Sequence, residues 1–194
     1  SKPVQFVVNT HWHYDHTDGN ENFGKAGAII VSHENSRKRL ESKQYIELVG
    51  RYMEAYPKEG LPKITFKNSM TFHYNEETIN IFHVDRAHTD GDAIIFFPKS
   101  NVLHMGDVFV RYVFPFIDEP NGGNINGMIR TLDKVAQLTD GETKIIPGHG
   151  PISTKEDLLD YQNMLITIRN RVKVQVNLGK TLKEIIASNP TRGY

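Results

Sequence analysis

The chain has 194 residues, of which 23 are Lys or Arg and 23 are Asp or Glu, so its formal net charge is zero. A chain of this length fits one domain, residues 1–194, and can bury a sizeable hydrophobic core. Balanced charge argues against nucleic acid as a partner, and no run of the sequence approaches the roughly 18 apolar residues of a membrane span.

The first expected elements surround a loop with four potential metal ligands. Residues 4–9 form a predicted strand, and the loop after it reads His-Trp-His-Tyr-Asp-His over residues 11–16. Imidazole and carboxylate groups are ligands that a divalent ion such as zinc prefers. Protonated imidazoles this close would repel one another, and a metal ion removes that repulsion. A polar, His-rich surface loop is the alternative, but this spacing of ligands favours a metal site.

The next segment is expected to form a helix, a strand and a longer helix. We predict a short helix over residues 20–25 and a strand over residues 28–32. A longer helix is predicted over residues 34–56, ended by Pro57 and Gly60. Its apolar residues, set among many charges, are Leu40, Ile46, Leu48, Val49 and Met53.

The middle of the chain combines predicted hairpins with alternating strands and helices. The turn Asn75-Glu76-Glu77 joins two predicted strands, and residues 98–101 join two more. A loop rich in Pro and Gly covers residues 109–123 and precedes a predicted helix over residues 125–138. This pattern suits sheets flanked by helices. The predicted strands cover residues 64–67, 70–74, 78–84, 93–97, 102–105 and 144–146.

Three further candidate ligands follow short apolar runs. His88 follows the run at 79–84, Asp107 follows the run at 102–105, and His149 lies in Pro-Gly-His-Gly after a third run. Ligands at strand ends are held by a rigid scaffold and still face an open surface. A single His after a strand is most often a turn residue or a partly buried, hydrogen-bonded group. Several strand ends that all present His or Asp favour one shared site.

The C-terminal segment is expected to form two helices with a structural role. Ser153 and Glu156 indicate a capping box before a helix over residues 154–176. Apolar residues at helical spacing predict that this helix buries one face. Thr181 and Glu184 begin a second helix. The apolar stripe fits a core face better than a surface for a partner.

The order and context of the ligand motifs resemble the metallo-β-lactamase-fold hydrolases. The resemblance rests on His-x-His-x-Asp-His at 11–16, then His88, Asp107 in Met-Gly-Asp, and His149 in Pro-Gly-His-Gly. It implies an α+β fold, a four-layer αββα sandwich, and two Zn²⁺ ions, with Fe or Mn as alternatives. The implied ligands of the first ion are His11, His13 and His88. The implied ligands of the second ion are Asp15, His16 and His149, with Asp107 as the bridge.

This chain departs from the family at its start. A strand-rich segment normally precedes the first motif, whereas only ten residues do so here. We therefore expect the N-terminal sheet to lack its usual strands and to have an unpaired edge. Such an edge favours association, so we expect a homo-oligomer or a missing N-terminal segment supplied in trans.

The resemblance implies a zinc-dependent hydrolase in which metal-bound hydroxide cleaves an ester, thioester, lactone or amide. A β-lactam is a further candidate substrate. The expected partner is a small-molecule substrate. Asp107 would hold the two ions together, and Asp15 would assist the leaving group. The alternatives are an inactive metal-binding relay or accessory protein and a di-iron redox protein. His rather than Glu at position 13 favours hydrolytic zinc over the di-iron flavoprotein branch.

The remaining aromatic and imidazole candidates are weaker. Lactone hydrolases of the family often place a tyrosine near the metals, and Tyr112 is the candidate for that catalytic role. A packed loop aromatic is the alternative for Tyr112. His83 and His104 lie inside predicted strands, where a role in supporting other groups fits better than ligation. Four histidines are therefore not expected to be ligands: His33, His73, His83 and His104.

Overall fold

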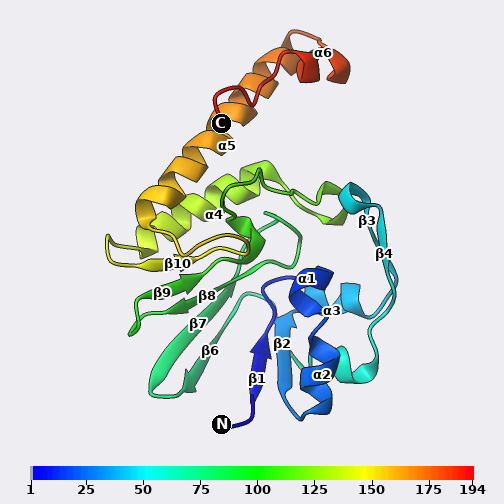
Figure 1. Ribbon diagram of the computed structural model, residues 1–194, viewed down its shortest axis with the longest axis vertical. Helices are drawn as coiled ribbons and strands as arrows, with labels where there is room; N and C mark the ends of the chain where they lie inside the picture. The colour runs from blue at the N-terminus through cyan, green and yellow to red at the C-terminus, as the bar shows by residue number, and fades with distance from the viewer. Residues whose placement is uncertain (1) are drawn as a thin grey trace.

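The computed structural model describes residues 2–194, which form four layers (Figure 1). Two β-sheets pack face to face in the middle. Helices α2 (Asn20–Lys25) and α3 (Glu34–Leu40) cover the smaller sheet, and α4 (Ile125–Leu138) and α5 (Lys155–Asn177) cover the larger one. This arrangement confirms the predicted αββα sandwich. Among the described residues, no helix is long and apolar enough to span a membrane.

The smaller sheet has three parallel strands in the order β1-β2-β5. They are β1 (Phe6–Val8), β2 (Ile29–His33) and β5 (Ile64–Phe66). Val31 of β2 lies in register with Val8 on one side and Ile64 on the other. Strand β1 therefore lies at an edge of this sheet within the described chain.

The larger sheet has five strands in the order β10-β9-β8-β7-β6. Both predicted hairpins are present, β6 with β7 and β8 with β9. The first turn contains only Asn75 and Glu76, both with positive φ as two-residue hairpin turns require, and Glu77 already belongs to β7. The strands are β6 (Ser69–Tyr74), β7 (Glu77–His83), β8 (Ala93–Phe97), β9 (Val102–His104) and β10 (Lys144–Ile146).

Apolar residues cover both faces of the larger sheet, because it lies between the other sheet and the helices. In β8, Ile95 packs toward the smaller sheet with Val31 and Ile81. Its neighbour Ile94 faces the opposite side, where it joins Leu132 of α4. Successive strand residues point to opposite faces, so the continuous apolar run of β8 is what a strand buried on both faces needs.

The prediction of one continuous helix over residues 34–56 is wrong. Helix α3 ends at Leu40, and the chain continues as a hairpin of β3 (Gln44–Ile46) and β4 (Arg51–Met53) around the 3₁₀ turn η1 (Glu47–Val49). Gly50 adopts a φ of 60°, which a glycine tolerates and a continuing helix forbids. Three of the spaced apolar residues, Leu40, Ile46 and Met53, nevertheless reach a common core around buried Trp12, whereas Leu48 and Val49 are exposed.

The C-terminal helices are confirmed, but the first cap lies one residue later than expected. Thr154, not Ser153, caps α5 and forms a capping box with Asp157. Ser153 is unavailable because its backbone pairs with Ile145 in an isolated β-bridge. Helix α6 (Leu182–Ala187) begins with the predicted capping box of Thr181 and Glu184.

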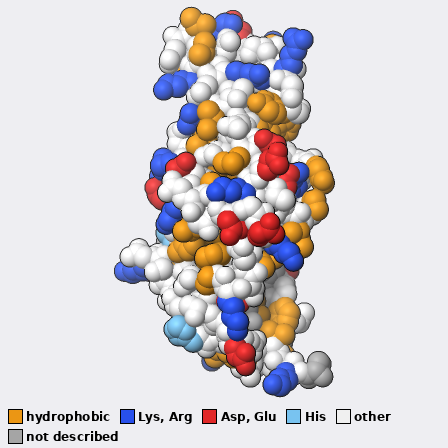
Figure 2. Space-filling view, turned by 90° about the vertical axis from the view of Figure 1, so that its left-hand side faces the viewer, with side chains coloured by type: hydrophobic (Ala, Val, Ile, Leu, Met, Phe, Trp, Pro, Cys, Tyr) orange, Lys and Arg blue, Asp and Glu red, His pale blue; other side chains and the backbone are white. Residues whose placement is uncertain are grey.

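The outer surface carries both signs of charge. Figure 2 shows Lys and Arg side chains interspersed with Asp and Glu on the face in view, over the length of the molecule. Most ion pairs are exposed, such as Lys25 with Glu21 and Lys43 with Glu54. Exposed pairs of this kind contribute little to stability, so the fold depends mainly on its apolar layers.

Removal of one core side chain tests this packing. Leu132 on α4 is fully buried, whereas Leu138 on the same helix is 44% exposed. We expect Leu132→Ala to lower the free energy of unfolding by about 2–5 kcal/mol because it leaves a cavity. Leu138→Ala is the matched control and should cost less than about 1 kcal/mol. Urea unfolding in a chelator measures both, and equal losses would contradict this assignment of the core.

Candidate metal centre

All candidate ligands lie at one end of the sandwich. The loop after β1 presents His11 and His13, and helix α1 (Tyr14–Thr17) presents Asp15 and His16. The other three ligands follow β7, β9 and β10. These three strands run in one direction, because β7 and β9 are both antiparallel to β8 and β10 is parallel to β9. Their carboxyl ends, and so His88, Asp107 and His149, meet at the same edge.

Glycines let two of these loops approach closely. The Gly148 amide donates hydrogen bonds to the Gly106 and Phe109 carbonyls, at 2.8 and 3.0 Å. A Cβ atom on Gly148 would lie 1.9 Å from Asp107 Oδ1. Only glycine at position 148 therefore leaves room for the carboxylate. The Pro-Gly-His-Gly motif thus serves Asp107 as well as its own histidine.

The first ligand group consists of His11, His13 and His88, which are all buried. His88 Nδ1 donates to the Phe116 carbonyl at 2.7 Å, so its Nε2 carries a lone pair. That nitrogen lies 2.9 Å from His13 Nδ1. The buried Nε2 of His11 has no hydrogen-bond partner in the described part of the chain. Facing lone pairs and an unpartnered ring nitrogen fit a cation bound among the three rings.

Burial keeps two histidines of this group, His11 and His88, in the form that binds metal. The pKa of His88 is lowered to about 4, first by burial and then by His13. Burial, followed by the neighbouring imidazoles, also lowers the pKa of His11 well below its usual value. Ligation requires neutral imidazole, so these two histidines are ready to bind a metal at neutral pH.

The second group consists of Asp15, His16, Asp107 and His149. His16 Nε2 lies 3.2 Å from Asp15 Oδ2 and 3.1 Å from Asp107 Oδ1. His149 Nε2 lies 3.0 Å from Asp15 and 3.3 Å from Asp107 Oδ2. The same Asp107 oxygen is 3.8 Å from His88 Nε2. Asp107 therefore lies between the two groups.

The side chains of the second group form charged pairs with one another. Burial would lower the pKa of His16, but its hydrogen bonds to Asp107 and Asp15 outweigh burial and raise the pKa to about 9. Burial would raise the pKa of Asp15, and the hydrogen bond from His16 holds it well below its usual range instead. A metal ion would replace the His16 proton, since metal binding releases protons from its ligands.

Both groups suit divalent metal ions. Within each group, one ligand atom per residue lies within 4.8 Å of the others. The first offers three nitrogens, and the second offers nitrogens and carboxylate oxygens, a mixture that zinc and iron both accept. The structure therefore brings together all seven ligands suggested by the sequence: His11, His13, Asp15, His16, His88, Asp107 and His149.

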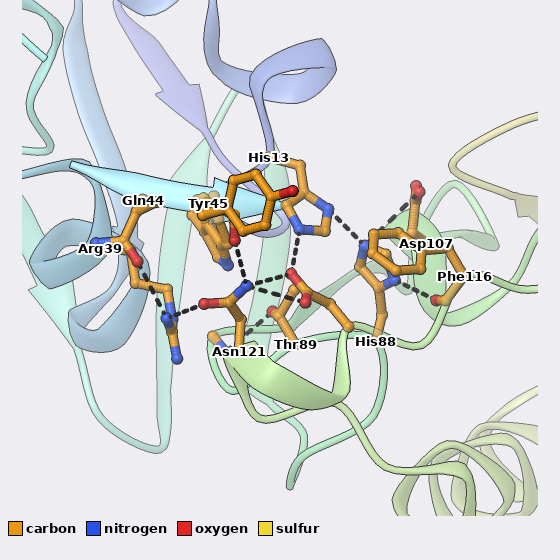
Figure 3. A network of polar contacts seen from close by, with 12 residues as sticks. His13, Arg39, Gln44, Tyr45, His88, Thr89, Asp107, Phe116 and Asn121 are labelled. Carbon is orange, nitrogen blue, oxygen red and sulfur yellow. Dashed lines mark hydrogen bonds and ion pairs between the residues drawn. The ribbon is translucent and has the colours of Figure 1, made fainter. Parts of the chain in front are cut away.

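A chain of hydrogen bonds supports His13 from behind (Figure 3). His13 Nε2 donates to the fully buried Asp118 at 2.9 Å, which leaves Nδ1 free for the metal. Asn121 Nδ2 donates to both Asp118 oxygens, at 2.9 and 2.8 Å. Arg39 donates to Asn121 Oδ1 and pairs with Asp90. Sequence reasoning missed these residues, because Asp118 and Asn121 lie in a loop without a recognisable motif.

Asp92 fixes the loop that carries His88. Its carboxylate accepts hydrogen bonds from the His88 and Thr89 amides, at 2.6 and 2.9 Å. Burial raises the pKa of Asp92 to about 7. His83 Nδ1 lies 2.8 Å from the Asp92 carbonyl, and the His83 ring stacks on His33 at 3.7 Å. His83 therefore supports this loop, as the strand position suggested.

The other histidines stay outside both ligand groups of the described chain. His104 Nδ1 accepts a hydrogen bond from the Gly106 amide at 3.1 Å, next to Asp107. His33 Nε2 contacts the Lys67 carbonyl, and burial, followed by His83, lowers the pKa of His33 to about 4. His73 lies on β6 near Thr78.

Tyr112 lies away from the ligands. Its side chain is 82% exposed, so the alternative of a packed loop aromatic is wrong. Tyr112 lines a cavity of about 680 Å³ with Tyr161 and Met164. This cavity shares Val110, Val113 and Phe114 with the pocket of about 200 Å³ that contains Asp15, Asp107 and His149, but Tyr112 does not line that pocket. In this conformation the structure does not bring Tyr112 to the candidate metal centre.

Comparisons with known proteins identify a family that matches most of the chain. The model of the Metallo-beta-lactamase superfamily matches residues 1–149. A hydroxyacylglutathione hydrolase of Pelagibacter ubique (strain HTCC1062) is 26% identical over 147 residues, which are 75% of this chain and 52% of that protein. The chain thus spans about half the length of this relative.

Solved structures agree on the fold. BLEG-1 B3 metallo-beta-lactamase is similar at a TM-score of 0.70 and 21% identity, over 84% of this chain and 78% of that chain. TTHA1623, solved in a di-iron-bound form, is similar at a TM-score of 0.64 and 21% identity, over 80% of this chain and 74% of that chain. A metallo-beta-lactamase and a protein solved in a di-iron-bound form therefore share this architecture.

Substitution of Asp118 tests the support behind His13. Asp118→Ala removes the acceptor that fixes the His13 ring, so we expect zinc affinity to fall roughly 10–100-fold. Asp118→Asn keeps the shape and should retain part of the affinity. Zinc titration with a competing chelator measures the change, and wild-type affinity in Asp118→Ala would show that the network does not orient the ligand.

The His16 ion pairs predict a pH dependence of the metal-free protein. The folded-state pKa of about 9 lies above the ordinary value of 6.5, so their stabilisation is complete below pH 6.5 and is lost as pH rises through 9. We expect the urea midpoint of chelator-treated protein to fall over this range, and the His16→Gln variant to fall less. Parallel curves for the two proteins would contradict the assigned pairs.

Proposed function

The chain belongs to the metallo-beta-lactamase superfamily, and we propose on this basis that it is a binuclear zinc hydrolase of small acyl compounds. The scissile bond belongs to an ester, thioester, lactone or amide. The observation that carries this proposal is the position of Asp107 between two groups of ligands, with contacts to His16, His149 and His88. Two ions about 3.5–4 Å apart are a common arrangement for hydrolysis.

The side chains around the site have distinct parts in such a reaction. Zinc, when bound, lowers the pKa of water and stabilises negative charge on a carbonyl oxygen. The buried rings of His11 and His88 provide neutral nitrogen ligands. The side chain of Asp107 is 11% exposed and contacts both ligand groups, whereas that of Asp15 is 35% exposed and lines the pocket. Asp15 is therefore placed to receive a proton or to guide one to the leaving group.

A di-iron redox protein is the second candidate. It is supported by the similarity to TTHA1623 in its di-iron-bound form. The similarity to a hydroxyacylglutathione hydrolase supports hydrolysis instead, as does the histidine at position 13. An inactive accessory protein would retain the ligands without turnover. Metal content and turnover together separate these three functions.

Metal analysis and a substrate panel test the proposal. Protein purified without chelator should contain about two zinc ions per chain, by the count of two ligand groups. It should hydrolyse at least one of nitrocefin, a thioester, an aryl ester and an acyl-homoserine lactone. Chelation should abolish this activity, and added zinc should restore it. Bound zinc without turnover would support the accessory function, and bound iron with redox activity would support the second candidate.

Two substitutions three positions apart test whether Asp107 bridges the two ligand groups. Asp107→Ala removes the carboxylate between the ligand groups, so we expect turnover to fall by several orders of magnitude and the second ion to be lost. His104→Ala removes only a supporting hydrogen bond and should reduce turnover roughly 10–100-fold. Similar losses in both variants would show that the ligands on this segment are wrongly assigned.

A further inference from the structure

The pocket beside the ligands has apolar walls from two distant segments. One wall comes from the β3–β4 hairpin and contains Ile46, Leu48 and Val49. The opposite wall comes from the segment after η3 (Gly106–Val108) and contains Val110, Val113, Phe114 and Phe116. Apart from the ligands, Tyr14 is the one polar side chain that lines the pocket in the described structure. Apolar groups thus surround the place where a substrate would meet the metals.

Several of these side chains are exposed. Leu48 is 67% exposed and Val49 is 51% exposed on the hairpin. Val113 and Phe114 are 60% and 49% exposed on the other wall. Apolar patches exposed around a site frequently mark a binding surface. Here the patches lie on both sides of the opening to Asp15 and His149, so a molecule bound at the metals would cover them.

The nearby cations are already paired. No Lys or Arg lines the pocket within the described chain. Arg51 stacks on Tyr14 at 3.6 Å and lies 3.6 Å from Asp18. Arg111, just beyond the second wall, pairs with Asp157 at 2.8 Å. A substrate carboxylate away from the scissile bond would therefore meet apolar side chains, and burial of such a charge without a partner is costly.

We propose that the acyl group of the substrate is uncharged and apolar and binds between Leu48 and Val49 on one side and Val113 and Phe114 on the other. This inference rests on the proposed hydrolase function and names the substrate class of the same site. In the reaction the bond between acyl carbon and leaving atom breaks, and water supplies OH to the acyl carbon and a proton to the leaving group. The reaction needs no oxidant or reductant.

A matched pair of esters tests the substrate class. 4-Nitrophenyl butyrate and mono-4-nitrophenyl succinate share a leaving group and a four-carbon acyl chain, but the succinate ends in a carboxylate. We expect kcat/KM of the zinc-loaded protein to favour the butyrate by about tenfold or more, after subtraction of the uncatalysed hydrolysis of each ester, which for the succinate includes attack by its own carboxylate. Equal values, or a preference for the succinate, would overturn the inference.

Binding without turnover separates this inference from the proposed function. Hexanohydroxamic acid and the monohydroxamic acid of adipic acid carry the same metal-binding group and differ by a terminal carboxylate. We expect the zinc-loaded protein to bind the first about tenfold more tightly. Such a preference in a protein that hydrolyses neither these esters nor any compound of the substrate panel would contradict the hydrolase function and support the apolar site. Equal affinities would contradict the apolar site, whether or not the esters are cleaved.

Substitutions in the walls test the residues named. Leu48→Lys and Phe114→Lys place a cation on an exposed position of each wall, so folding should be retained. We expect each to reduce the butyrate-to-succinate ratio of kcat/KM at least fivefold, because the carboxylate gains a partner. Val174→Lys is the matched control, since Val174 is 55% exposed and lies outside the pocket. Ratios unchanged in both wall variants would show that these walls do not contact the acyl group.

Discussion

The candidate metal centre holds five imidazoles and two carboxylates together at one edge of the sandwich, and this arrangement has a cost in free energy that the rest of the structure must offset. Three of the rings are buried. Burial lowers the pKa values of two of them, His11 and His88, so these two rings do not bind protons at neutral pH and cannot reduce this cost in that way. The lone pairs of His13 and His88 face each other at 2.9 Å. Bound cations satisfy these nitrogens and the carboxylates together, which gives the arrangement a physical reason to exist.

The fold serves this constraint through strand direction and close backbone approach. Three strands of the larger sheet and one of the smaller end at the same edge, so ligands from residues 11 to 149 converge there. Gly148 permits the contact with Asp107 that a side chain would prevent. Behind His13, the contacts through Asp118 and Asn121 to Arg39 connect the ligand to helix α3. Orientation of the ligands thus depends on both halves of the sandwich.

The ligands were predictable because their signal is local. Closely spaced His and Asp residues, and His or Asp directly after apolar runs, can be recognised without knowledge of tertiary contacts. The same holds for the β6–β7 hairpin and for the cap at Thr181. Asp118 had no such signal, since its role arises from a contact with His13 that spans 105 positions.

The errors in secondary structure have physical causes. Spaced apolar residues suggested a helix over residues 34–56, but a shorter helix and a hairpin with Gly50 at its turn bury only Leu40, Ile46 and Met53 around Trp12. Apolar spacing in a short segment does not distinguish these two solutions. Similarly, serine often caps helices, but the backbone of Ser153 forms a β-bridge with Ile145. The N-cap of α5 is therefore Thr154. Both errors arise from tertiary contacts that override local preference.

The same hairpin that the sequence failed to predict supplies one wall of the pocket, and the loop without a motif supplies the other. The metal centre is thus the predictable part of the site, and the surface that selects a substrate is the part that requires the structure. The central claim is that the two ligand groups hold two ions bridged by Asp107. Anomalous diffraction at the zinc absorption edge from crystals of the zinc-loaded protein tests it most directly. We expect two anomalous peaks per chain, about 3.5–4 Å apart, with Asp107 in contact with both. A single peak, or zinc bound only at surface residues away from His11, His88 and His149, would contradict it.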